Sequence, residues 1–169
     1  MRHWLKYLIG WSLCILYRLS PFHIPNLEPN LSVIMPFSKK LGWFGGALFG
    51  ILSMVMFDLI TGKIGLWTLL TAGAYGLVGA LAPIALKRMS YVAYAVVGAV
   101  VFDALTGLTM GPLLFAQPFS QALIGQIPFT AMHILGNALF ALAVSPLIEK
   151  YVIENRKLEL GFEPAAVQA

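Results

Sequence analysis

The sequence predicts an all-α integral membrane protein with six transmembrane helices. Of the 169 residues, 59% are hydrophobic and only 11% are charged, whereas a soluble domain carries about 25% charged residues. The apolar residues form long runs, and the basic residues lie between those runs. Each crossing needs roughly 20 residues. We therefore expect one membrane domain over residues 1–150 and a cytoplasmic tail over 151–169 that frays.

The first two predicted helices differ in kind. The first runs from Trp4 to Leu19 and has no small-residue cleavage site after it, so we expect it to be retained rather than removed as a signal peptide. A proline-rich loop then interrupts the chain. The next apolar piece, Leu31 to Phe37, ends at Lys39 and Lys40 and is too short to cross as a regular helix. We expect this second helix to be short or broken.

Four longer apolar runs follow. They are Leu41 to Ile60, Leu66 to Leu86, Tyr91 to Leu105, and about Phe119 to Ile148. Gly46 and Gly50 in the third helix are four residues apart, a spacing that lets a neighbouring helix approach closely. The uncharged stretch from Thr106 to Pro118 is expected to be an outer loop.

The basic residues predict the orientation. With six crossings, one side of the membrane receives nine basic residues: Arg2, Lys6, Lys39, Lys40, Lys87, Arg88, Lys150, Arg156 and Lys157. The other side receives only Arg18 and Lys63. Because cytoplasmic loops carry the excess of Lys and Arg, both termini are expected in the cytoplasm.

An internal repeat places two aspartates in similar positions. Residues 55–62 resemble residues 100–107 at an offset of 45, and parallel repeats occur in transporters. Chance similarity between apolar stretches is the alternative. Within the repeat, Asp58 and Asp103 are candidate ligand contacts, because carboxylates in membranes are costly. The alternative is a helix-ending turn, in which Gly62 and Gly107 supply the left-handed residue.

The most specific signal is a polar stripe on the last helix. Gln126, Thr130, His133 and Asn137 are spaced so that they share one helix face. Unpaired polar groups in hydrocarbon cost several kcal/mol. The stripe is therefore expected to face a ligand cavity or to be packed against another helix.

Further candidate contacts lie near the predicted outer mouth. Glu28, Trp67, Gln117 and Gln121 would reach it from loops and helix ends. Loop solvation is the alternative for the three polar residues, and anchoring at the membrane interface is the alternative for Trp67. A weaker polar stripe on the fourth helix comprises Thr68, Thr71 and Tyr75.

The sequence lacks the common catalytic motifs. It has no phosphate-binding loop, no H-E-x-x-H zinc motif and no G-x-S-x-G nucleophile elbow. It has no basic face for nucleic acid, and Cys14 is its lone cysteine, in an apolar run. We expect a protein that is not an enzyme and uses no cofactor or metal.

Several stretches resemble the substrate-binding S components of energy-coupling factor (ECF) transporters. They are Ile24-Pro25-Asn26-Leu27-Glu28-Pro29, Gly42 to Asp58 with Thr61-Gly62, Leu66-Trp67-Thr68, and Gly125 to Phe129 followed by His133 and Gly136-Asn137. The resemblance implies six helices, cytoplasmic termini and capture of a vitamin or precursor at the outer face of a prokaryotic cell membrane. It also implies two partners: a membrane coupling protein and a pair of ATPase subunits.

One feature departs from this family, and two other functions stay open. Many S components carry alanines four apart in the first helix, where the coupling protein docks, but this chain has Gly10 and Cys14. A non-catalytic membrane scaffold would pack the polar stripe against another helix without a cavity. A lipid-modifying enzyme would need a carboxylate or histidine cluster at the cytoplasmic interface, which the sequence does not contain.

Overall fold

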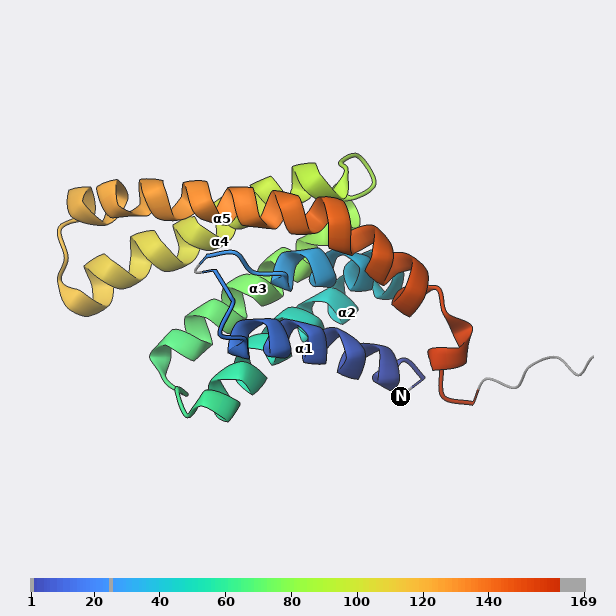
Figure 1. Cartoon of the computed structure of the whole chain (residues 1–169). Coiled ribbons are helices and arrows are strands. Elements are labelled where there is room, and N and C mark those ends of the chain that lie inside the picture. The colour runs from blue at the N-terminus through green and yellow to red at the C-terminus, as the bar shows by residue number, and fades with distance from the viewer. Residues whose placement is uncertain (1, 25, 162–169) are drawn as a thin grey trace, which may run out of the picture.

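The computed structural model describes residues 2–24 and 26–161 (Figure 1). Its helices are α1 (Trp4–Leu19), α2 (Asn30–Thr61), α3 (Leu66–Ala85), α4 (Tyr91–Phe115) and α5 (Phe119–Ile148), followed by short turns at Glu149–Ile153 and Arg156–Leu158. The described residues contain no strand, so the predicted all-helical class is confirmed. Pro25 and the end of the predicted tail, residues 162–169, lie outside the described residues.

Four helical stretches are long and apolar enough to cross a membrane. They are Asn30–Thr61, Leu66–Ala85, Tyr91–Phe115 and Phe119–Ile153, with mean hydropathy between 1.5 and 1.8. Many of their large apolar side chains face outward, which in a membrane places them against lipid. The coarse prediction of a membrane-embedded helical bundle agrees with this structure.

Helix α2 consists of two arms that fold back on each other at Gly42. Gly42 has φ 77° and ψ −174°, which interrupts the helix, and a residue with a side chain rarely adopts a positive φ. The rings of Phe37 and Phe49, on either side of the break, are 4.5 Å apart. Asn30 Nδ2 likewise lies 3.7 Å from Met54 Sδ. The first arm (30–41) extends past the predicted end at Phe37, and the second arm (43–61) matches the predicted third helix closely.

The first arm of α2 forms the centre of the bundle. Every residue from Asn30 to Ser38 is buried. Helix α1 covers it with an aromatic cluster in which the Tyr7 ring lies 4.9 Å from Phe37. Helix α5 crosses it, and Ser145 Oγ donates a hydrogen bond of 2.7 Å to the Ser32 carbonyl.

Glycines bring the second arm of α2 against α3. A Cβ placed on Gly50 would lie 2.5 Å from the carbonyl oxygen of Tyr75. Gly46 and Gly79 approach each other in the same way, backbone to backbone. The prediction that the glycine spacing permits close helix packing is therefore confirmed.

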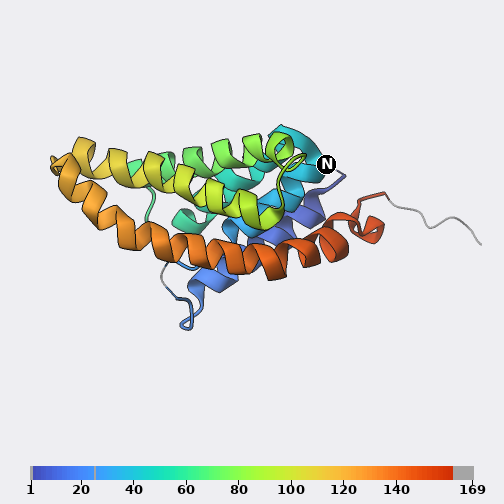
Figure 2. The same ribbon diagram turned by 90° about the horizontal axis from the view of Figure 1, so that it is seen from above.

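Helices α4 and α5 form a hairpin whose tip projects beyond the rest of the bundle (Figures 1 and 2). The predicted end of the fifth helix at Leu105 is wrong, because α4 continues to Phe115 and only residues 116–118 connect it to α5. The hydroxyls of Thr106 and Thr109 donate to carbonyls one turn earlier, so they stay satisfied within the helix. The tip exposes apolar side chains, including Leu113, Phe115, Phe119, Ile124 and Ile127.

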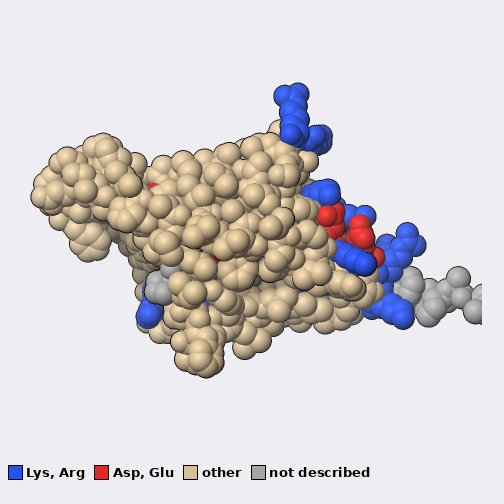
Figure 3. All heavy atoms as spheres, turned by 45° about the horizontal axis from the view of Figure 1, so that its top comes forward, with Lys and Arg blue, Asp and Glu red and all other residues tan. Residues whose placement is uncertain are grey.

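The opposite end of the bundle gathers most of the charged side chains (Figure 3). Lys39 Nζ lies 2.7 Å from Glu149 Oε1. Lys6 Nζ is buried and donates to the Ile153 carbonyl at 2.7 Å and to Glu159 Oε1 at 2.9 Å. The described part of the tail is held against the start of α1, where the Leu160 amide also donates to the Arg2 carbonyl at 3.0 Å.

Candidate functional site

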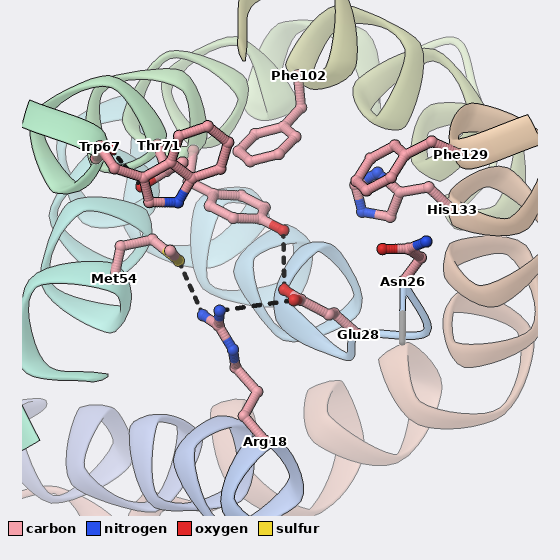
Figure 4. A pocket seen from close by; sticks show the side chains of 10 residues that line it. Arg18, Asn26, Glu28, Met54, Trp67, Thr71, Phe102, Phe129 and His133 are labelled. Carbon is pink, nitrogen blue, oxygen red and sulfur yellow. Dashed lines mark hydrogen bonds and ion pairs between the residues drawn. The ribbon is translucent and has the colours of Figure 1, made fainter. Parts of the chain in front are cut away.

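A polar cavity of about 80 Å³ lies where the loop before α2 meets the five helices (Figure 4). Its lining residues are Arg18, Asn26, Glu28, Met54, Trp67, Thr71, Tyr75, Phe102, Phe129 and His133. These residues come from every helix of the bundle, so the folded arrangement rather than one local motif builds the cavity. We call it the inner cavity.

One side of the inner cavity is formed by Glu28 and its partners. Glu28 Oε1 lies 3.6 Å from an Arg18 guanidinium nitrogen, and Glu28 Oε2 accepts from Tyr75 at 3.3 Å and from Asn30 at 3.4 Å. Arg18 also donates to Met54 Sδ at 3.0 Å. This network places one cation and one carboxylate in contact, so their charges compensate each other.

The other side is formed by His133, which contacts Asp103 on the side away from the cavity. His133 Nδ1 lies 2.7 Å from Asp103 Oδ1, and the two side chains are 3% and 1% exposed. Asp103 Oδ2 and Asn137 Oδ1 are buried without a hydrogen-bond partner among the described residues. Buried oxygen atoms without a hydrogen-bond donor are uncommon. These two oxygens indicate that the site can accept further hydrogen bonds.

Asp103 does not lie at the end of a helix, as one of the two sequence interpretations predicts. It lies inside α4, twelve residues before the helix ends at Phe115, so the helix-ending turn predicted for Asp103 and Gly107 is wrong. Asp58 does lie near the end of α2, where Gly62 caps the helix with φ 67°. Asp58 Oδ2 accepts from Thr68 at 2.6 Å and does not line the inner cavity.

Aromatic side chains form the walls. The Phe102 and Phe129 rings lie 5.7 and 5.8 Å from the His133 ring, both edge-on. Tyr75 packs against Phe102 at 4.2 Å, and Trp67 stands at the rim with half of its surface exposed. Flat apolar walls with polar groups at two ends suit a small planar molecule.

A second cavity, the outer cavity, adjoins the first. It has a volume of about 280 Å³, and Arg18, Asn26 and Glu28 line both cavities. His23 and Lys63 also line it, so it is the more polar of the two. The two cavities therefore meet at the Arg18–Glu28 pair, which lines both.

The polar stripe of α5 divides between the two predicted environments. His133 lines the inner cavity, whereas Asn137 is fully buried and donates to the His133 carbonyl at 2.9 Å. Gln126 donates to Thr130 at 3.1 Å and lies against Gly107 of α4. One of the four stripe residues therefore faces the cavity directly, Asn137 is packed, and Gln126 and Thr130 are half-buried and bonded to each other.

Some of the remaining predicted residues line the inner cavity and others do not. Glu28 and Trp67 line the inner cavity, as do Thr71 and Tyr75 of the weaker stripe. Gln117 and Gln121 are exposed near the tip of the α4–α5 hairpin and line neither cavity.

The sequence reasoning missed four lining residues: Arg18, Met54, Phe102 and Phe129. Arg18 carried a signal, because it is one of only two basic residues on its side of the predicted membrane. The other three lie within apolar runs and give no local signal.

No group of three or more His, Cys, Asp or Glu residues that could hold a metal occurs in residues 2–24 and 26–161. No protein-family model, curated protein or solved structure matches this chain.

Proposed function

We propose that this chain is the substrate-binding membrane subunit of an ECF-type transporter, which captures a vitamin or a related small molecule at the outer face of a prokaryotic cell membrane. Separate ATPase subunits and a membrane coupling protein would power release into the cell. The supporting observation is the inner cavity, which gathers Arg18, Glu28 and His133 inside an otherwise apolar bundle. Charged and titratable groups at such positions are expensive and usually functional.

The topology supports the same proposal. The two arms of α2 bring the number of helical segments before the tail to six among the described residues. If each segment crosses, Arg18 and Glu28 lie on the outer side, together with the cavity mouth. Lys6, Lys39 and Glu149 then lie on the cytoplasmic side, in agreement with the positive-inside rule.

The inner and outer cavities together have the volume of a small-molecule binding site. Small-molecule sites usually occupy about 300–1,000 Å³, whereas the inner cavity has about 80 Å³ and the outer cavity about 280 Å³. A vitamin-sized ligand would place one ring in the inner cavity and extend past the Arg18–Glu28 pair into the outer one.

The proposal is tested by ligand capture. Purified protein in detergent is incubated with radiolabelled vitamins and nucleobases, and bound molecules are identified by native mass spectrometry. We expect one compound to bind. We expect His133→Ala and Glu28→Gln each to lower its binding affinity at least tenfold, since each removes a buried polar contact. Gln121→Ala, on the exposed hairpin, is the matched control. If both cavity variants bind like wild type, the site assignment is wrong.

A non-catalytic membrane scaffold is the second candidate. The burial of Asn137 and the packing of Gln126 against α4 favour it, because a scaffold would use polar side chains only to join helices. In that case no compound binds in the cavity and shields its residues from a labelling reagent. Cysteines introduced at Thr71 or His133 would then show no ligand-dependent change in reactivity.

A further inference from the structure

The charges around the inner cavity do not balance when His133 is neutral. Arg18 and Glu28 compensate each other across 3.6 Å. Asp103 has no cationic partner other than His133, and its Oδ2 atom is buried without a hydrogen bond among the described residues. One negative charge is then left in the bundle interior, and an uncompensated buried charge is costly.

His133 connects this charge to the cavity. An ionised carboxylate only accepts hydrogen bonds, so the ring proton of His133 lies on Nδ1, which donates to Asp103 Oδ1. In the neutral ring the other nitrogen, Nε2, then carries a lone pair. No hydrogen bond to Nε2 occurs among the described residues, and His133 lines the cavity. The Asp103 end of the cavity therefore offers an acceptor backed by a negative charge.

The opposite side offers a second acceptor, and the walls between them are aromatic. Glu28 lines the cavity with its carboxylate. Phe102, Phe129 and Tyr75 supply ring faces and edges. Aromatic faces attract organic cations, most strongly where water is excluded.

We propose, building on the function proposed above, that the inner cavity binds a small planar organic cation with N–H donors at two ends, of the class of protonated amino-substituted nitrogen heterocycles. One N–H donates to His133 Nε2, and the other end lies near Glu28. The positive charge of the ligand compensates Asp103. A volume of about 80 Å³ limits this part of the ligand to a single ring.

Three probes of nearly equal shape test the charge preference. They are 4-aminopyridine, a planar cation at neutral pH; aniline, its neutral counterpart; and benzoate, an anion. Binding to the full-length protein in detergent is measured by isothermal titration calorimetry. We expect 4-aminopyridine to bind at least tenfold more tightly than aniline, since charge-assisted hydrogen bonds are the stronger kind, and benzoate to bind weakest. Equal binding of the first two, tighter binding of benzoate, or no binding of any probe overturns the inference.

Two variants link the preference to Asp103. Asp103→Asn keeps the shape of the side chain but removes its charge, so the ratio of 4-aminopyridine to aniline affinity should fall towards one. Asp58→Asn removes a buried carboxylate that lines neither cavity and should leave this ratio unchanged. A ratio that stays the same in Asp103→Asn contradicts the inference.

Failure here is distinguishable from failure of the proposed function. If the vitamin and nucleobase screen yields a neutral or anionic ligand whose binding needs His133, the cavity remains a capture site and only the charge assignment is lost. If that screen yields no ligand, the transporter proposal itself fails.

Discussion

Replacing Gly50 with alanine is expected to push α2 and α3 apart. The new Cβ would lie 2.5 Å from the Tyr75 carbonyl oxygen and 2.7 Å from its carbonyl carbon. Ordinary contact begins near 3.4 Å, so the two backbones would have to separate by about 1 Å, and a packed interior resists such a shift. Overpacking of this kind costs about 1–3 kcal/mol. The gain from replacing a helical glycine, about 0.5–1 kcal/mol, offsets only part of that cost.

Gly73→Ala is the matched control for this prediction. Gly73 lies in α3, the helix that Gly50 of α2 approaches, and a Cβ there would meet nothing within 4 Å. We expect this variant to be more stable than wild type by about 0.5–1 kcal/mol. Equilibrium unfolding in mixed micelles, followed by circular dichroism, measures both variants. If Gly50→Ala is as stable as Gly73→Ala, the proposed close approach of α2 and α3 is wrong.

The Gly50 variant also reports on the cavity. The backbone atoms that the new methyl group would contact belong to Tyr75, whose hydroxyl donates to Glu28 at 3.3 Å. Moving Tyr75 by about 1 Å would break a hydrogen bond of this length. Gly50→Ala should therefore weaken ligand binding as well as folding, whereas Gly73→Ala should leave binding intact.

Three further predictions concern other parts of the fold. Gly42→Ala should destabilise the protein by about 1–2 kcal/mol although nothing lies within 4 Å of it, because alanine is strained at its φ of 77°; wild-type stability in micelles would contradict this. Ser145→Ala should cost about 1 kcal/mol by removing the bond to the buried Ser32 carbonyl, and Ser145→Thr, which keeps the hydroxyl, should recover part of that loss. The hydrogen bond from Lys6 lowers the pKa of Glu159 below its ordinary value of 4.5; ionised Glu159 therefore stabilises the fold above pH 4.5, and this contribution is lost as the pH falls through the lowered pKa. The melting temperatures of wild type and Glu159→Gln should accordingly converge on acidification, and a gap that persists at low pH would rule this out.

The sequence located the helices well where local chemistry marks their ends. Leu19 is followed within two residues by Pro21, and Phe119 follows Pro118, so α1 and α5 begin and end as predicted. The predicted end of α4 came too early because Gly107 resembles a helix-ending turn residue and the stretch after it is uncharged. In the structure this stretch is helical, and membrane helices tolerate glycine and proline more readily than soluble ones.

The site was only partly predictable for a different reason. His133 and Glu28 stand out because polar residues in or beside apolar runs are rare. Phe102 and Phe129 look like any lipid-facing residue until the packing of α4 on α5 is known. The pairing of Asp103 with His133 joins positions 30 residues apart on two helices, and no local pattern encodes that pairing.

The reversal at Gly42 has a consequence for biogenesis. The first arm of α2 has about 12 residues and a length of about 18 Å, well short of a bilayer core of about 30 Å. It carries Asn30, Ser32 and Ser38, and every residue from Asn30 to Ser38 is buried in the bundle. Such a segment would gain too little from lipid to insert by itself, so we expect it to enter a membrane together with the second arm, as one hairpin. The most deeply enclosed helix of the mature protein would then reach its place only after its neighbours have assembled around it.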